Sequence, residues 1–245
     1  MVVLVLVGFI ATFIGTLCGS GGLINVPAML LLGIPIHTVI SSNKFSNTIS
    51  SFSSFFVLLK NKTIQLKHAL WMAPFSFLGG VTGGKITLYI SAHTMQIVAI
   101  FLLSFALLLN FLKKPTQKDG VTTKPKLMTF PAIFGIGMYD GMFGPGQGTL
   151  LMYTFLQQGL SYLKAIAFTR FQTFLSCLGA FITYVSSPYF NWSVALPLAL
   201  GSFLGAQLAV KLAPKLPKVY LIWLLRLVTF LLIVQLTYQL IQKSV

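Results

Sequence analysis

The sequence predicts an all-α polytopic membrane protein made of two inverted-topology repeats, each with about five helical segments and a glycine-broken helical hairpin. Three observations predict this fold class: the composition, an internal repeat, and the placement of lysine residues along the chain. Of the 245 residues, 56% are hydrophobic and 8% are charged, and the mean hydropathy is +0.88. A soluble domain carries about 25% charged residues. Long apolar runs in so uncharged a chain indicate helices that span a lipid bilayer.

The internal repeat has a constant offset of 126 residues, which relates Lys44 to Arg170. Each of these cations lies in an apolar stretch and follows a glycine-rich break, CGSGG at 18–22 and GPGQG at 144–148. The same offset relates Gly15 to Gly141, Gly33 to Gly159, Phe45 to Phe171, Ser50 to Ser176, Ser76-Phe77-Leu78-Gly79 to Ser202-Phe203-Leu204-Gly205, and Lys85 to Lys211. Because no gap interrupts this register, the chain is predicted to contain two copies of one membrane unit.

The two copies are predicted to occupy residues 1–112 and 128–245, joined by a cytoplasmic linker at 113–127 that is rich in lysine and proline. Apolar segments fall at 2–17, 23–34, 43–59, 68–90 and 95–112 in the first copy, and at 128–143, 149–160, 164–186, 193–212 and 217–241 in the second. The first two segments of each copy are shorter than the about 20 residues that a spanning helix needs. Each short pair is therefore either a hairpin of half-helices or one discontinuous helix.

Lysine placement distinguishes these two interpretations, because cytoplasmic loops of membrane proteins are enriched in lysine and arginine. With hairpins, the lysine-bearing loops at 60–67, 113–127 and 211–218 are all cytoplasmic and the uncharged turn at 187–192 lies outside. With single crossings, the 211–218 loop lies outside instead. Hairpins are therefore favoured, and they put the 60–67 loop and its repeat counterpart near 186–193 on opposite sides of the membrane. The two copies are thus predicted to have opposite orientations, as in many secondary transporters.

Lys44 and Arg170 are the leading candidates for a substrate site. A cation near the bilayer centre costs about 2.5–3.5 kcal/mol on insertion scales, and such residues usually face a cavity. The alternative is that each lies near a segment end and extends its charge to the membrane surface, and Lys44 is only a few residues into its predicted segment. Recurrence at the same repeat position favours a functional role.

The glycine-rich breaks are candidates for the same site, since unwound backbone at membrane depth is tolerated where it lines a cavity or is buried in protein. A helix that begins after such a break points its N-terminal amides at the cavity, which favours an anion. The residues assigned to anion binding are therefore Lys44, Arg170, Gly19, Ser20, Gly21, Gly22, Asn43, Gly144, Gly146, Gly148 and Thr149. A tight turn without a ligand is the alternative for the breaks, and hydrogen bonding between helices is the alternative for the polar run at 41–54 that contains Asn43.

The chain contains two acidic residues, Asp119 in the linker and Asp140 just before the second break. An intramembrane carboxylate is a candidate for proton coupling or a counter-charge to Arg170. A helix-end salt bridge or an N-cap is the structural alternative. At the repeat offset the counterpart of Asp140 is Ile14, so the acid is not part of the repeated pattern.

Composition and motifs argue against several other functions. The net charge of +15 comes mostly from lysines in short loops, where they are expected to meet anionic membrane lipids, so no nucleic-acid partner is expected. No residue spacing matches a metal site and no nucleotide-binding motif is present, so neither a metal nor a cofactor is expected. Cys18 and Cys177 are expected to be packed small residues. We therefore do not expect an enzyme.

Four stretches carry a family resemblance: GTLCGSGGLINVPAMLLLGIP and SNKFSN in the first copy, and YDGMFGPGQGTLLM and AFTRFQTFLSCLGAFITY in the second. On these residues the chain resembles the TauE/SafE family of sulfite exporter-like transporters over nearly its whole length. The resemblance implies transport of a small sulfur-containing or organic anion, with Lys44 and Arg170 binding it and the glycine loops gating or binding. Position 170 departs from the family pattern, because it is Arg where Lys is common, and the two side chains differ in geometry.

The expected function is secondary transport of a small anion, such as sulfite or a sulfonate, by alternating access around the two breaks. The alternative is a non-transporting membrane accessory or assembly subunit, although such a protein does not need two broken helices. The expected location is the cell (inner) membrane, with several passes. Substrate identity, transport direction, coupling ion and oligomeric state are left open.

The inverted arrangement predicts that both chain termini lie outside the cell. A tag placed after Val245 should react with a membrane-impermeant reagent in intact cells. A tag inserted in the 113–127 linker is the matched control and should react only after the membrane is permeabilised. Strictly cytoplasmic labelling of the C-terminal tag would contradict this topology.

Overall fold

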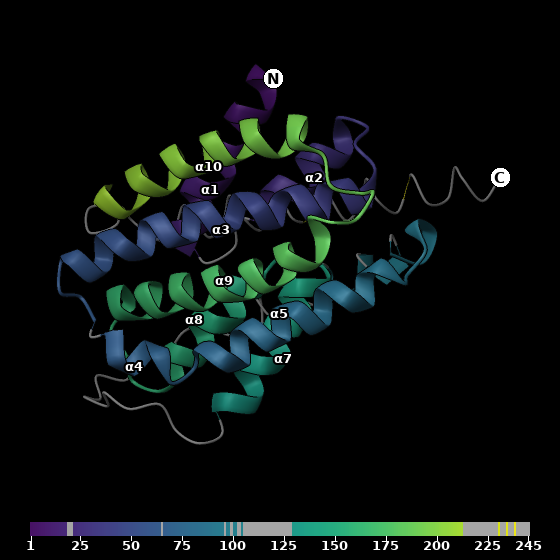
Figure 1. The fold of residues 1–245 in the computed structure, drawn as a ribbon. Helices are drawn as coiled ribbons and strands as arrows, with labels where there is room; N and C mark the ends of the chain where they lie inside the picture. Colours follow the sequence, from purple (N-terminus) through teal and green to yellow (C-terminus); the bar gives the residue numbers. More distant parts are fainter. Residues whose placement is uncertain are drawn as a thin grey trace.

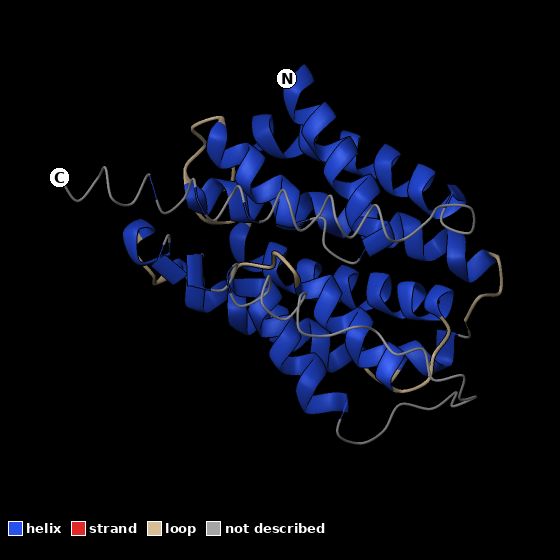
Figure 2. Cartoon of the chain, turned by 180° about the vertical axis from the view of Figure 1, so that it is seen from behind, coloured by secondary structure: helices blue, strands red, loops and turns tan. Residues whose placement is uncertain are grey.

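The structure is a computed structural model. It describes residues 1–18, 22–64, 66–95 and 129–212, together with 97, 98, 100, 101, 104, 230, 234 and 238. Throughout these residues the regular structure is helical, as Figure 2 shows. The expected linker at 113–127, the expected segment at 217–241, Val245, and the candidate site residues Gly19, Ser20 and Gly21 lie outside the described residues.

The described helices are α1 (Val2–Cys18), α2 (Gly22–Leu31), α3 (Ile36–Lys60), α4 (Leu66–Leu70), α5 (Ala73–Leu88), α7 (Thr129–Met142), α8 (Gln147–Gln157), α9 (Tyr162–Tyr184) and α10 (Trp192–Leu212). The two short helices α2 and α8 follow the two glycine breaks, as predicted. Two predicted bounds are wrong. The helix expected from residue 43 begins at Ile36, so that the whole serine-rich run is helical. The segment expected at 68–90 divides at a turn before Ala73, because Pro74 lies at the start of α5, where a proline is tolerated but cannot continue a preceding helix.

The central pair of helices is α3 and α9, which are repeat counterparts and run in opposite directions (Figure 1). Aromatic contacts fix this arrangement: Phe45 packs on Phe181, Phe52 on Phe174 and Phe55 on Phe171, with ring centroids 5.1, 5.1 and 4.6 Å apart. Residue numbers rise on α3 as they fall on α9, so the two helices are antiparallel neighbours.

The flanking helices exchange partners between the two halves. α1 of the first half packs along α10 of the second, and α7 of the second half packs along α5 of the first (Figure 1). Glycines allow these close approaches. A Cβ atom at Gly205 would overlap the backbone carbonyl of Phe9, and a Cβ atom at its repeat counterpart Gly79 would overlap that of Phe134. The two halves therefore build one bundle rather than two adjacent ones.

Two apolar clusters are separated by a polar layer. On α3, Val39 and Ile40 belong to the first cluster and Phe55 to the second, and the serine-rich run lies between them. On α9 the order is reversed, with Phe171 in the second cluster and Tyr184 in the first. The polar side chains of both central helices therefore lie in the middle of the bundle.

Two of the described helices combine the length and the hydropathy of a membrane span: Tyr162–Tyr184 (α9) and Trp192–Leu212 (α10). The apolar helix at the N-terminus, α1, is shorter. α3 has 25 residues but carries the serine-rich run.

Helix packing through glycine gives a prediction about stability. A Cβ atom at Gly83 would overlap the carbonyl of Met138 on α7, whereas a Cβ atom at Gly135 would meet nothing within 4 Å. Gly83→Ala should lower the melting temperature of the detergent-purified protein, because overpacking of a tight contact costs about 1–3 kcal/mol. Gly135→Ala is the matched control and should leave the melting temperature unchanged or raise it, because alanine favours helix. Equal melting temperatures for the two variants would contradict the observed packing of α5 on α7.

Candidate anion site between the glycine breaks

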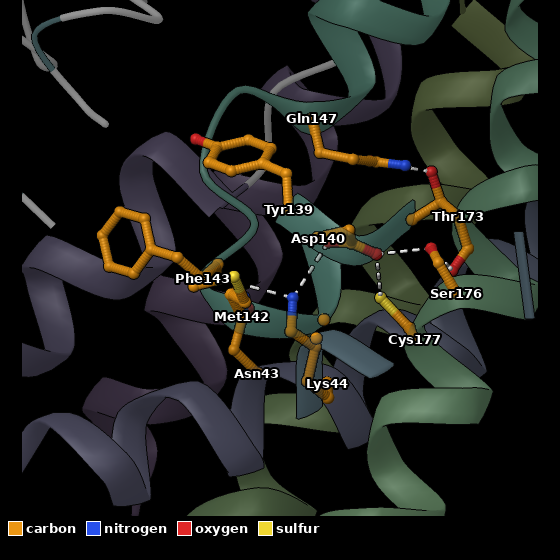
Figure 3. Close-up of polar contacts among 12 residues, drawn as sticks. Asn43, Lys44, Tyr139, Asp140, Met142, Phe143, Gln147, Thr173, Ser176 and Cys177 are labelled. Atoms are coloured by element: carbon orange, nitrogen blue, oxygen red, sulfur yellow. Dashed lines mark hydrogen bonds and ion pairs between the residues drawn. The ribbon is translucent and has the colours of Figure 1, made fainter. Parts of the chain in front are cut away.

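The polar layer contains a buried ion pair between α3 and α7. Lys44 Nζ lies 2.9 Å from Asp140 Oδ1, and the relative exposures of the two side chains are 0% and 2% (Figure 3). Lys44 Nζ also donates to the carbonyl of Phe143 at 3.5 Å. Lys44 lies well inside α3 and points into the bundle, so the alternative in which it extends to the membrane surface is wrong.

The carboxylate of Asp140 has further donors on α9. Its Oδ2 accepts hydrogen bonds from Ser176 Oγ and from the thiol of Cys177, the latter at 3.2 Å (Figure 3). Hydrogen bonds to a charged acceptor contribute about 1.5–3 kcal/mol each. The counter-charge expected for Arg170 is therefore bound to Lys44 instead, and the salt-bridge alternative for Asp140 is the one observed.

The second glycine break is shaped around this ion pair. Gly144 has φ +96°, and a Cβ atom there would overlap both Lys44 Nζ and Asp140 Oδ1. Gly146 has φ +85° at the N-cap of α8. Such positive φ values favour glycine strongly. Gly144 therefore brings the chain close to the buried ion pair, and the role predicted for the break in anion binding stays a prediction.

Arg170 on α9 has a different environment from Lys44. Its Nε donates to Ser54 Oγ at 2.7 Å and its Nη2 donates to Ser50 Oγ at 3.3 Å, both on α3. The side chain is 8% exposed. Asp140 is the single acidic side chain of the described residues, and its ion pair is with Lys44. The guanidinium is therefore held by neutral hydroxyls, whereas the Lys44 ammonium has a carboxylate partner.

A small polar cavity lies where the two glycine breaks meet. Its walls are Thr12, Gly22, Asn47, Asp140, Gly144, Gln147, Gly148, Thr169, Arg170 and Thr173. Two repeat pairs are among these residues: Gly22 with Gly148, and Asn47 with Thr173. The cavity volume is about 20 Å³, which holds one or two water molecules. It is smaller than a sulfite or sulfonate group, so an anion enters only if the surrounding helices separate.

Three polar side-chain atoms of the cavity wall lack a hydrogen-bonding partner. The unpartnered atoms are Gln147 Nε2, Thr169 Oγ1 and Thr12 Oγ1, and each side chain is at most 3% exposed. The other end of the Gln147 amide accepts a hydrogen bond from Thr173 Oγ1 at 3.1 Å (Figure 3). A buried polar atom without a partner costs about 1–3 kcal/mol, and a bound ligand would remove that cost.

The structure separates the candidate residues into groups. Arg170, Asp140, Gly22, Gly144 and Gly148 line the cavity. Asn43 does not line it and instead accepts a hydrogen bond from Asn25 at 3.2 Å.

The amides at the second break are used inside the turn. The Gln147 N–H donates to the carbonyl of Gly144 and the Thr149 N–H to that of Gly146, at 3.0 Å each. These two amides are therefore engaged within the turn, and the assignment of the break residues to anion binding stays a prediction.

The sequence analysis missed the cavity residues Thr12, Gln147, Thr169 and Thr173. The repeat offered a signal for two of them. Thr173 is the counterpart of Asn47, and Thr169 is the counterpart of Asn43, so polar residues recur at matched positions of the two copies. Gln147 also lies inside the GPGQG break itself.

These features define a class of protein: a helical membrane protein with a broken helix in each half and a cationic, donor-rich cavity where the breaks meet, which is the architecture of a membrane transporter. The chain belongs to the sulfite exporter TauE/SafE family, whose pattern matches residues 4–236.

Relatives of the chain carry consistent descriptions. A probable membrane transporter protein of Sinorhizobium sp is 36% identical over 209 residues, which cover 84% of this chain and 80% of the relative. Probable membrane transporter proteins of Haemophilus influenzae and Escherichia coli K12 are 29% and 26% identical, over 86% of this chain in both cases and over 84% and 79% of the relatives. No solved structure matches the chain significantly.

The buried ion pair gives a prediction about stability. Lys44→Ala and Asp140→Ala should each destabilise the protein by about 3–5 kcal/mol, because each leaves an uncompensated buried charge. The double variant Lys44→Met with Asp140→Leu should recover most of that loss. Melting temperatures of the purified variants measure both effects, with the exposed Lys85→Ala as the control for loss of a lysine. Single variants as stable as Lys85→Ala would contradict the pairing.

Proposed function

We propose that the protein is a secondary transporter that moves a small oxyanion, such as sulfite or a sulfonate, across the cell (inner) membrane by alternating access, with the anion bound at Arg170. One observation carries the proposal: a guanidinium that has no carboxylate partner among the described residues shares a small buried cavity with three polar atoms that lack hydrogen-bonding partners.

The charge of the cavity favours an anion. Lys44 neutralises Asp140, so Arg170 leaves the cavity with one net positive charge. A cation would meet this charge at short range in a region from which water is largely excluded. The planar guanidinium can donate two parallel hydrogen bonds to one oxyanion. The Gln147 amide and the Thr169 hydroxyl supply further donors at the same cavity.

The layered core supports alternating access. The polar layer lies between the two apolar clusters, so that both ends of the bundle are closed by packed side chains. Phe143 and Tyr184 belong to the first apolar cluster. In the second cluster Phe155 packs on Phe168, with ring centroids 5.4 Å apart. Opening one cluster at a time would expose the cavity to one side at a time. The antiparallel repeat counterparts α3 and α9 support inverted repeats, in which the two openings are related by the repeat symmetry.

The choice of sulfite or a sulfonate rests on the family description, sulfite exporter TauE/SafE. Both groups present several oxygens around one sulfur atom, which suits a site made of an arginine, an amide and hydroxyls. The pair formed by Lys44 and Asp140 adds a proton-coupling proposal. Protonation of Asp140 would leave Lys44 without its counter-charge and raise the positive charge beside the cavity, so a proton and an anion would bind together.

The transport proposal is tested by flux into proteoliposomes with sulfite, sulfate and methanesulfonate as the probes. Arg170→Gln should lower the flux at least tenfold, because hydrogen bonds between charged groups contribute about 1.5–3 kcal/mol. The flux of Arg170→Lys should lie between those of Arg170→Gln and the unchanged protein, because lysine keeps the positive charge but cannot donate two parallel hydrogen bonds to one oxyanion. Lys164→Gln, at an exposed position, is the matched control and should leave the flux unchanged.

Two outcomes would count against the proposal. Unchanged flux in Arg170→Gln would reject the site. No flux of any probe through the unchanged protein, together with a stably co-purifying membrane partner, would favour the accessory-subunit alternative.

A further inference from the structure

The repeat offers a direct comparison of the two cation environments. The offset that relates Lys44 to Arg170 also relates Ser176 to Ser50 and Cys177 to Ser51. On the Lys44 side, the carboxylate of Asp140 lies between the cation and the Ser176–Cys177 pair, and it contacts all three.

The serines that correspond across the repeat have the same local geometry. Ser176 Oγ lies 3.3 Å from the carbonyl of Thr173, three residues earlier, and Ser50 Oγ lies 3.4 Å from the carbonyl of Asn47, also three residues earlier. Each of these hydroxyls also reaches a charged side chain: Ser176 donates to Asp140, and Ser50 accepts from Arg170. The two pockets are therefore built on the same plan.

Among the residues that the structure describes, no carboxylate occupies the equivalent place in the Arg170 pocket. The counterpart of Asp140 at the repeat offset is the apolar Ile14. The counterpart of the Cys177 thiol is the hydroxyl of Ser51, which is fully buried and has no hydrogen-bonding partner. A donor that is satisfied by a carboxylate in one half is therefore unsatisfied in the other.

We propose that the transported anion binds at Arg170 in the position that the Asp140 carboxylate occupies at Lys44, with Ser50 and Ser51 as its hydroxyl donors. This inference rests on the proposed function and names the contacts of the anion. The contacts of the Asp140 carboxylate are then an internal example of the contacts of the ligand, because this carboxylate belongs to the chain and occupies the repeat-related pocket. The ligand class is a small oxyanion with two oxygen atoms that can accept hydrogen bonds at once, which includes carboxylates as well as sulfite and sulfonates.

Helix geometry connects this pocket to the cavity. Asn47 lines the cavity, and Ser51 follows it by four residues, so both lie on one face of α3. Thr173 also lines the cavity, and Cys177 follows it by four residues on α9 in the same way. An anion that enters the cavity therefore meets Arg170 first and Ser51 one helical turn further along.

The replacement of a thiol by a hydroxyl fits the difference between a tethered and a diffusing anion. The Asp140 carboxylate is held in place by the chain, so its effective concentration is high and a weak thiol donor suffices. A free anion has to be held by its contacts alone, and a serine hydroxyl is a stronger donor than a thiol.

Binding measurements on the purified full-length protein test this inference, with sulfite and acetate as the two probes and ligand-dependent thermal stabilisation as the signal. Ser51→Ala should raise the dissociation constant of each probe about threefold to tenfold, the effect expected for one lost hydrogen bond. Ser51→Asp should abolish binding of both probes, because the new carboxylate would occupy the pocket and pair with Arg170. Ser51→Asn, which adds bulk without charge, should bind more tightly than Ser51→Asp.

Ser42→Ala is the matched control. Ser42 is another fully buried serine of α3 with an unpartnered hydroxyl, and it lies nine residues before Ser51, on the opposite face of the helix. It should bind both probes as the unchanged protein does. Size-exclusion profiles identify variants that fail to fold, and Ser51→Ala tests the inference by itself if Ser51→Asp is one of them.

The outcomes separate this inference from the proposed function. If Arg170→Gln loses binding while Ser51→Ala and Ser51→Asp bind normally, the pocket assignment is overturned and the anion site at Arg170 stands. If the unchanged protein binds neither probe, the anion site and this inference both fail.

Discussion

The ion pair between Lys44 and Asp140 is the interaction on which the rest of the polar layer depends. It neutralises the acidic side chain closest to Arg170, and so it leaves the cavity with the positive charge of a single guanidinium. It also joins α3 of the first half to α7 of the second, at a place where Gly144 is required because any side chain there would overlap the pair. The backbone conformation at Gly144, the contact between α3 and α7, and the net charge of the cavity therefore all depend on this ion pair.

The two copies share a frame and differ in chemistry. The antiparallel pair α3 and α9, the glycine breaks and the exchanged packing of α1 and α7 all follow the repeat. The charged groups do not, because the first copy carries isoleucine and lysine where the second carries an acid and arginine. A symmetric bundle can present two equivalent pockets. Filling one of them with a carboxylate from the chain itself leaves the other for a ligand, which is how a duplicated unit acquires a single site.

Much of the fold could be predicted from the sequence, because composition, apolar segments and repeat register depend on local patterns and on the bilayer. The helix that follows each break was predicted for the same reason. Pairing was not predictable: Asp140 lies close to both cations along the polar layer, and only the packing of α7 decides that it contacts Lys44. The start of α3 at Ile36 was also missed, since the polar side chains between His37 and Ser42 interrupt the apolar pattern and their burial between helices is not visible in the sequence. Gln147 and Thr169 were missed because an unpartnered atom is a property of the assembled core.

The exchange of flanking helices has a consequence for biosynthesis. α1 is made before the other described helices, but the helix on which it packs most extensively, α10, is made after all of them. The glycine contacts that hold them, such as that of Gly205 with the backbone of Phe9, cannot form until α10 has been made. Contacts between segments so distant in sequence form late in folding. The apolar face that α1 presents to α10 must therefore stay covered by something else during synthesis, and the bundle closes only when α10 arrives.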